Sequence, residues 1–420
     1  MLGLLLGVSL GSPDRSWPIS KVYAQDDNDD DTDNDDDNGN GDDNGDDSGN
    51  DDDDDDDDVA EPEPLLDQAP DEITVTSLSD DDLATLLTQG FTIVQQGGRD
   101  DAPIHRLRIP TGRTLEQSRI DVRALPTGQD ADFNHYYRTE QSTCNGPQCR
   151  ALEQIAFQSH TCSQRDVAIG IIDTSINVDH EVFADRQVTI YRVHESPHPA
   201  SRALHGTAVA AIIVGDPESR VPGLVPASHL FAVDAFTRER GDERTDAFAL
   251  VVGLDWLEQQ GVEIINMSLA GPDNTALAAA IDRVSRAGII VVAAAGNKGP
   301  TAPPAFPAAY PGVISVTAVD ASNNIFAMAQ HGPHIDLAAP GVDVWTAASV
   351  SGGRLKSGTS YAAPFVSSAA ALVLSAEPHL TPDEVIQQLE STALDLGDEG
   401  HDEVFGVGLV QIGGWCVNGN

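Results

Sequence analysis

The sequence predicts an α/β protein built on a doubly wound parallel sheet, with a small α+β domain before it. From about residue 166 onward, apolar strand-like segments alternate with helical stretches, which is the order of a parallel sheet covered by helices on both faces. The segment Gly288–Ala295 is apolar at every position, which indicates a strand buried on both faces. The predicted strands are 167–172, 229–234, 262–267, 289–295 and 313–318, and the predicted helices are 205–214, 245–259, 274–287, 358–376 and 381–392.

The charge balance excludes two classes of partner. The chain has 420 residues with 23 basic and 68 acidic side chains, a formal net charge of −45. A nucleic-acid-binding protein needs a basic face, and anionic lipid repels an acidic one. Beyond the N-terminus no apolar run reaches the roughly 18 residues of a membrane span. We therefore expect a monomer with no nucleic-acid partner and no membrane span.

The first 61 residues are predicted to lie outside any folded domain. Met1–Leu10 is apolar but too short to span a bilayer, and Val22-Tyr23-Ala24 resembles a small-residue cleavage site. Residues 1–24 are therefore predicted to be a secretory signal peptide, although no Lys or Arg precedes the apolar run. Residues 25–61 are predicted to be disordered, because 26–58 holds 21 Asp among only Asn, Gly, Ser and Thr.

This acidic tract contains one set of residues with the spacing of a calcium loop, namely Asp36, Asn38, Asn40, Gly41 and Asp47. Asp stands at the last position, where Glu is usual, and no helical pattern flanks the loop. A tract of Asp, Asn and Gly matches such a template easily, so we interpret the tract as a solvated spacer. A calcium- or mineral-binding adhesion segment is the alternative.

Residues 62–138 show the pattern of a small α+β domain. Its expected features are a helix with Leu83, Leu86 and Leu87 that ends at Gly90, strands at Phe91–Val94 and Ile104–Ile109, and a capping box from Thr114 to Gln117 that opens a second helix. This order suits a compact sheet with two helices on one face.

Residues 139–165 are predicted to be a linker that carries three of the four cysteines, Cys144, Cys149 and Cys162; the fourth is Cys416. An even number in an exported chain favours two disulfides, with three pairings open. In one of them Cys144 and Cys149 close a small loop, and Cys162 and Cys416 tie the start of the main domain to its end. Free buried thiols are the alternative, and the spacings typical of zinc sites are absent.

Four polar residues stand where an α/β sheet places its chemistry, at strand ends and helix starts. Asp173 ends an apolar strand and could orient a histidine, and His205 opens an apolar helix. Ser360 begins an Ala-rich helix, and a serine is a nucleophile only when a base takes its proton. Asn297 ends a buried strand, and its amide could donate to developing negative charge. Taken singly, each has a plainer role in capping, turns or packing.

Taken together, the segments DTSIN, HGTAVAA, AAAGN and GTSYAAP resemble the motifs of the subtilisin-like serine peptidases (subtilases), in the same order. The resemblance covers about Asp166 to Val410. It implies that Ser360 is the nucleophile, His205 the general base and Asp173 the group that orients it. It also implies that Asn297 and the Ser360 N–H stabilise the oxyanion.

The resemblance further implies a substrate-binding segment at Ser268, Leu269, Ala270 and Gly271, opposite Ala295 and Gly296. The chain departs from the usual family motifs at Ser175, Ala208, Ala270, Tyr361 and Phe365. None of these departures removes a catalytic atom, but Ala270 and Tyr361 bear on substrate preference.

The 62–138 domain resembles the inhibitory propeptides of this family, which implies self-cleavage near Tyr137; a permanent accessory domain is the alternative. The predicted protein is a secreted or periplasmic serine endopeptidase, made as a zymogen, with residues 166–420 as its catalytic domain. It acts on polypeptides, is inhibited by its own propeptide and needs no cofactor for its chemistry, with no metal assigned and structural calcium left open. A catalytically silent peptide-binding relative is the rival. A lipase is excluded because GxSxG is absent around Ser360 and the triad order is wrong.

Overall fold

The computed structural model describes residues 66–99, 102–139, 151–157, 166–194, 200–239 and 241–413, and Leu65–Asn420 forms one compact unit. The predicted signal peptide, the acidic tract with its calcium-like spacing, and all four cysteines lie outside the described residues. The signal peptide, the acidic spacer and the disulfides therefore remain predictions.

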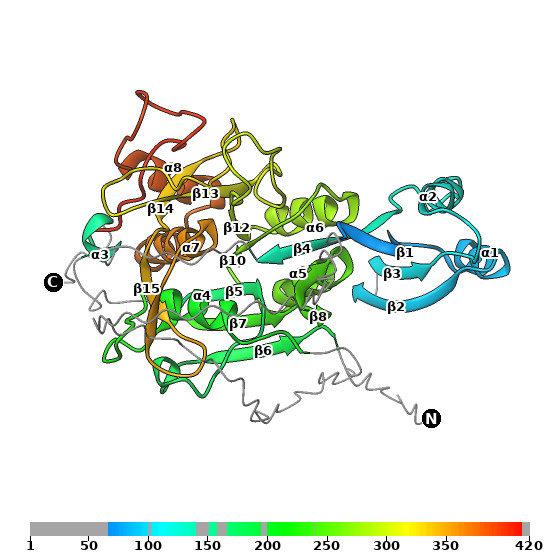
Figure 1. Cartoon of the computed structure of the whole chain (residues 1–420), viewed down its shortest axis with the longest axis horizontal. Coiled ribbons are helices and arrows are strands. Elements are labelled where there is room, and N and C mark those ends of the chain that lie inside the picture. Colours follow the sequence, from blue (N-terminus) through cyan, green and yellow to red (C-terminus); the bar gives the residue numbers. More distant parts are fainter. Residues whose placement is uncertain are drawn as a thin grey trace, which may run out of the picture. The chain divides into compact units, whose positions relative to one another are not determined.

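The core of the segment after residue 166, called the C-terminal domain here, is a seven-stranded parallel sheet with the order β14-β13-β12-β10-β5-β7-β6 (Figure 1). The doubly wound α/β prediction is therefore confirmed. The five predicted strands appear within two residues of their predicted ends, and β6 and β14 were not predicted. The strands are β5 (Ala168–Asp173), β6 (Val188–Arg192), β7 (His229–Asp234), β10 (Ile264–Met267), β12 (Ile290–Ala294), β13 (Val313–Val319) and β14 (Leu337–Pro340).

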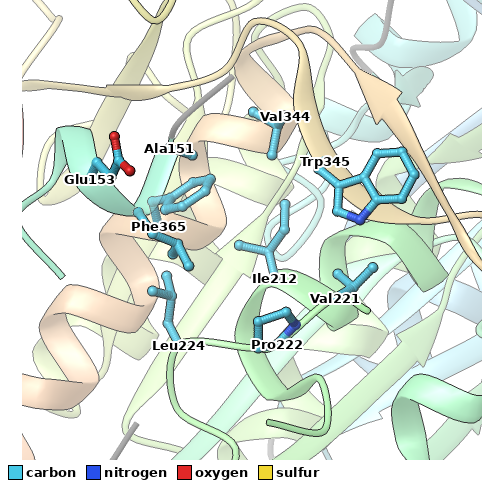
Figure 2. A pocket seen from close by; sticks show the side chains of 10 residues that line it. Ala151, Glu153, Ile212, Val221, Pro222, Leu224, Val344, Trp345 and Phe365 are labelled. Atoms are coloured by element: carbon cyan, nitrogen blue, oxygen red, sulfur yellow. The ribbon is translucent and has the colours of Figure 1, made fainter. Parts of the chain in front are cut away.

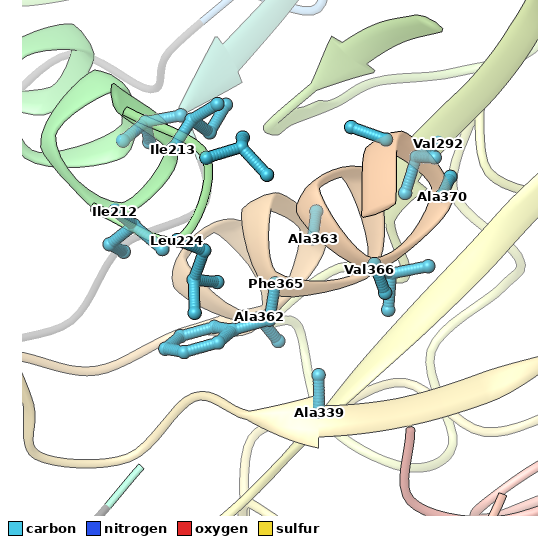
Figure 3. Packing of buried hydrophobic residues seen from close by; sticks show 14 of the residues in the cluster. Ile212, Ile213, Leu224, Val292, Ala339, Ala362, Ala363, Phe365, Val366 and Ala370 are labelled. Carbon is cyan, nitrogen blue, oxygen red and sulfur yellow. The ribbon is translucent and has the colours of Figure 1, made fainter. Parts of the chain in front are cut away.

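Helices cover both faces of this sheet. In β12, Ile290 and Val292 pack into one hydrophobic cluster with α4, α7 and α8, whereas Val291 and Ala293 pack into a second cluster with α5 and α6. Figure 3 shows Val292 beside residues of α7 in the first cluster. This alternation explains why the strand is apolar at every position. The helices are α4 (His205–Val214), α5 (Ala247–Gln260), α6 (Thr275–Arg286), α7 (Thr359–Ala376) and α8 (Pro382–Thr392).

Helix α7 is the central buried helix of this domain. Within the described part of the chain, it is the one helix with the length and hydropathy of a membrane span, and 89% of that stretch is buried inside the protein. Its Phe365 and Ala362 pack in the same cluster as Leu224 and Ile212 (Figure 3). The apolar composition of α7 is thus accounted for by packing in the core.

The N-terminal domain, residues 66–139, has the order β1-α1-β2-β3-α2-β4 around an antiparallel sheet ordered β2-β3-β1-β4. Leu86 of α1 and Val122 of α2 share one cluster with Ile73, Val75 and Leu107 of the sheet, so both helices lie on one face, as predicted. Strands β1 and β4 were not predicted. The elements are β1 (Gln68–Thr76), α1 (Asp80–Thr88), β2 (Thr92–Arg99), β3 (Ala102–Arg108), α2 (Leu115–Arg123) and β4 (Asp132–Thr139).

Local capping explains where two helices begin. Thr381 and Glu384 form the complete capping box of α8. At α2 only half of the predicted box forms: Thr114 accepts from the Gln117 N–H at 3.2 Å, but the Gln117 side chain donates to Asp121 instead. The prediction of a complete box at Thr114 is therefore wrong, because a carboxylate one turn along the helix competes for the Gln117 amide.

Strand β4 also pairs with strands of the C-terminal domain. Residues 136 and 137 of β4 pair antiparallel with β9, and residues 138 and 139 pair antiparallel with β11. The sheet of the N-terminal domain therefore continues through β4 into β9 and β8. The remaining short elements are α3 (Ala151–Gln154), η1 (Glu181–Phe183), β8 (Thr237–Glu239), β9 (Asp242–Asp246), β11 (Leu269–Ala270), β15 (Val344–Ala347) and β16 (Gly353–Lys356).

Buried acidic side chains fix the two domains to each other at the starts of α5 and α6. Asp132 of β4 accepts from the N–H and the hydroxyl of Thr275, the first residue of α6. Asp246, the N-cap of α5, lies 3.4 Å from Arg106 of β3. Burial acts to raise the pKa of Asp246, but Arg106 and hydrogen bonds outweigh it and hold the pKa lowered. Both contacts place negative charge at the positive end of a helix dipole.

Candidate active site

Asp173 and His205 meet at the carboxyl ends of the parallel strands. Asp173 is the last residue of β5, and the first residue of α4 is His205; both side chains are buried. Oδ1 of Asp173 lies 2.8 Å from Nδ1 of His205 and also accepts from the Thr174 N–H at 2.7 Å. This pairing fixes the imidazole with Nδ1 toward the carboxylate and Nε2 away from it. Among the described residues, Nε2 has no hydrogen-bond partner.

The loop after β5 is tied to the start of α4, which holds the pair in register. Gly206 N–H donates to Thr174 Oγ1 at 2.9 Å, and Thr207 Oγ1 accepts from the Asn177 N–H at 2.9 Å. A Cβ at position 206 would overlap the Thr174 carbonyl. Glycine beside the histidine is therefore required for this close approach.

Ser360 is the second residue of α7 and is fully buried. Its hydroxyl donates to the Ser268 carbonyl at 3.1 Å, and the Ser268 hydroxyl in turn donates to the Ser360 carbonyl at 2.7 Å. The structure thus brings Ser360 to the predicted substrate segment and not into a hydrogen bond with His205. The next residue, Tyr361, has its ring centroid 5.3 Å from that of His205, so the start of α7 lies against the imidazole.

Asn297 follows β12 and is held by the residue before the serine. Its Oδ1 accepts from the Thr359 N–H at 3.1 Å and from the Thr359 hydroxyl at 3.0 Å. Since the oxygen is engaged there, the NH₂ of the amide is turned to the opposite side. Gly296 has φ +105°, and a Cβ there would overlap Gln330, so glycine is needed at this turn.

The predicted substrate-binding residues form the edge that β4 occupies. In β11, Leu269 pairs with Thr139 and Ala270 pairs with Arg138. Gly271 contacts the ring of Tyr137, and its backbone exchanges two hydrogen bonds with Phe306. On the other side, Ala295 and Gly296 are buried after β12. The edge predicted to pair with substrate is therefore occupied by the chain's own residues 137–139.

Comparison with known proteins agrees with this geometry. The model of the subtilase family matches residues 164–408. The chain belongs to the subtilase family. It is a serine-type peptidase.

Individual relatives show how far the likeness extends. Subtilisin DY of Bacillus licheniformis is 36% identical over 252 residues, which are 59% of this chain and 89% of that one. The structure of the self-cleaved protease domain of PatA is 29% identical, has a TM-score of 0.52 and covers 59% of this chain and 94% of its own. Fervidolysin from Fervidobacterium pennivorans is 20% identical with a TM-score of 0.71 over 85% of this chain and 62% of its own. This last likeness shows that the shared fold extends beyond the matched family domain.

In this subtilase the structure also reveals polar neighbours of the Asp173–His205 pair that sequence reasoning missed. Asp234 of β7 stands directly beside Asp173 in the parallel pairing. The Ser201 hydroxyl donates to Asp234 at 2.8 Å and accepts from the Ser175 N–H at 2.8 Å, which anchors the loop before His205. Burial raises the pKa of Asp234 to about 6, against the opposing effects of Ser201 and Arg192. No motif marks these residues, and only the strand register brings them together.

A cavity of about 360 Å³ lies elsewhere in the domain. It is apolar and lined by residues such as Ile212, Leu224, Trp345 and Phe365 (Figure 2), and none of the predicted site residues lines it. Across the described ranges, no group of three or more His, Cys, Asp or Glu side chains is arranged to hold a metal ion.

Proposed function

We propose that this subtilase is a secreted serine endopeptidase, made as a zymogen, with Ser360, His205 and Asp173 as its catalytic triad. The observation that carries the proposal is the buried 2.8 Å contact between Asp173 and His205 beside the start of α7, which carries Ser360. Such a pair leaves one imidazole nitrogen available as a base, which is what a serine nucleophile requires.

The chemistry follows from these positions. In the proposed reaction the Ser360 hydroxyl leaves the Ser268 carbonyl and donates to Nε2 of His205. Nε2 accepts the proton as Oγ attacks the scissile carbonyl, and Asp173 stabilises the imidazolium through Nδ1. The Asn297 amide and the Ser360 N–H donate to the oxyanion. His205 then protonates the leaving amine, and water hydrolyses the acyl-enzyme by the same steps in reverse order.

The zymogen proposal is supported by the place of β4. Residues 138–139 pair with β11, and Tyr137 is fully buried with its hydroxyl donating to the Pro272 carbonyl at 3.0 Å. A substrate that pairs with β11 would need the same edge, so the N-terminal domain blocks it. We propose self-cleavage close to the end of β4, and the PatA protease domain is likewise described as self-cleaved. Secretion is proposed from the N-terminal segment that resembles a signal peptide.

The test compares the wild-type chain with Ser360→Ala, both expressed from residue 25. Intact mass, the mature N-terminus and casein hydrolysis are recorded. The proposal predicts that the wild type loses its N-terminal domain and digests casein, whereas the variant stays full length and inert. A wild type that remains inert after trace trypsin removes the N-terminal domain would refute catalysis. An active enzyme whose N-terminus lies upstream of residue 100 would refute the propeptide assignment alone.

A further inference from the structure

The end of β4 lies between two edges of the catalytic domain. On one side, Tyr136 pairs with Asp246 and Tyr137 with Thr245 of β9; on the other, residues 138 and 139 pair with β11. Under the proposed function, which this inference presupposes, a substrate's residues before the scissile bond take the same place. The position of each substrate side chain can therefore be derived from the register of β4.

That register places one acidic residue beside the substrate. Continuing the antiparallel pairing of β4 with β9 by two residues puts Glu243 opposite position 139. Residues two apart on a strand share a face, so Glu243 lies on the same face as Thr245. The partner of Thr245 is Tyr137, which is fully buried against Gly271. Glu243 thus lies on the face that is turned to the catalytic domain.

The surroundings of Glu243 confirm that it is near the catalytic pair. It accepts a hydrogen bond from the N–H of Arg202, three residues before His205. Burial raises the pKa of Glu243, the charge of Asp173 adds to this effect, and Arg202 and His205 oppose it. The residue is nevertheless only partly buried. In the described part of the chain, no Arg or Lys side chain forms an ion pair with it. Arg202 acts on the carboxylate electrostatically and Arg238 stands opposite Glu243 in the β8–β9 pair, so the partly buried carboxylate has cationic neighbours but no close ion pair among the described residues.

The strand pairing also shows which substrate residue, counted from the scissile bond, lies beside this carboxylate. Leu269 pairs with position 139, so the next residue of a bound peptide stands opposite Ser268. The Ser268 carbonyl is the group that holds the Ser360 hydroxyl. The residue opposite Ser268 is therefore the one whose carbonyl is attacked, and the residue at position 139 precedes it.

We propose that Glu243 is a specificity-determining residue that makes this peptidase prefer Arg or Lys as the second residue before the scissile bond. A cationic side chain at that position would lie beside a partly buried carboxylate that has no close ion pair among the described residues. In a partly buried setting, such a pair corresponds to a preference of about tenfold over a neutral side chain.

The test uses fluorogenic peptides in which Arg or Gln is placed, one position at a time, at each of the four residues before the cut. The processed wild-type enzyme is compared with Glu243→Gln and with Glu239→Gln, a charge-matched control on the same hairpin whose carboxylate pairs with Arg244. The measured quantity is the ratio of kcat/KM for Arg over Gln. This ratio is independent of the fraction of active enzyme, and the uncharged Glu243→Ala replaces any Glu243→Gln preparation that fails to fold.

The wild type is expected to show the tenfold ratio at the second position only, to retain it in Glu239→Gln and to lose it in Glu243→Gln. The ratio should also fall in about 0.5 M NaCl, where charge pairs at an open site are screened. A wild type without an Arg preference, or a preference that survives in Glu243→Gln, overturns the proposal while leaving the peptidase intact. Failure of the wild type to cleave any peptide, or cleavage that persists in Ser360→Ala, overturns the proposed function instead.

Discussion

Replacing Tyr137 with Ala is expected to lower the affinity of the N-terminal domain for the catalytic domain by at least two orders of magnitude. Tyr137 is fully buried, its ring rests on Gly271, and its hydroxyl donates to the Pro272 carbonyl at 3.0 Å. The neighbouring Tyr136 is only half-buried, and its hydroxyl accepts a longer hydrogen bond, 3.5 Å, from Arg244 of β9.

The magnitude follows from what each change removes. Truncating a fully buried aromatic side chain costs about 3–5 kcal/mol, which is a factor of roughly 10² to several thousand in affinity. Tyr137→Phe keeps the ring and removes only the hydrogen bond, which costs about 1 kcal/mol or roughly fivefold. The two variants together separate packing from hydrogen bonding.

The assay supplies residues 62–139 as a separate chain and measures the inhibition constant against the processed enzyme. Ile120→Ala is the matched control, since Ile120 on α2 is 52% exposed and lies outside the cluster that packs on the catalytic domain. Its inhibition constant should stay within threefold of the wild-type value. If Tyr137→Ala also inhibited within threefold of the wild-type segment, the view that Tyr137 anchors the propeptide would be wrong.

Three further predictions follow. Asp234 has a folded-state pKa of about 6, above its unfolded value, so the stability it contributes is present at low pH and is lost as pH rises through 6. The effect of Asp234→Asn on the free energy of unfolding should therefore be more favourable at pH 8 than at pH 4, by up to about 3 kcal/mol. Urea unfolding at the two pH values measures this difference, and an equal effect at both would contradict the prediction. His105 is buried and desolvation lowers its pKa, so the protein loses stability as pH falls below the unfolded pKa of about 6.5. His105→Leu should therefore reduce the drop in melting temperature that acid causes in the uncleaved chain. An unchanged drop would refute this prediction. Asn297→Ala should lower kcat by about 10²–10³ with KM little changed, a magnitude known for the equivalent donor in subtilisin, whereas a KM effect alone would exclude an oxyanion role.

The sequence predicted the catalytic sheet well because its strands are buried on both faces and apolar throughout. Strand β4 was not predicted, since Asp132–Thr139 alternates polar and aromatic residues and contains His135 and Arg138. Its polar residues are accounted for only in the folded chain: Asp132 caps α6 and Asn134 donates to Glu72 and Asp246. Such contacts join residues that are 62 to 143 positions apart, and no local pattern encodes them.

The candidate site was predictable to a similar degree. Motifs located Asp173, His205, Asn297 and Ser360, because each stands at a strand end or helix start within an apolar segment. They could not locate Glu243 or Asp234, because the proposed role of Glu243 and the position of Asp234 beside Asp173 follow from strand register. Nor could they show that Ser360 donates to the Ser268 carbonyl, since a serine rotamer depends on which acceptors surround it.

The most direct test of the triad is covalent labelling of the processed enzyme with a fluorophosphonate, which reacts with serines whose proton is removed by a neighbouring base. Peptide mapping should show one label per chain, on Ser360, and the labelling rate should fall by several orders of magnitude in His205→Ala. A label on a different serine, or an unchanged rate in His205→Ala, would contradict the assignment of Ser360 as a nucleophile activated by the Asp173–His205 pair.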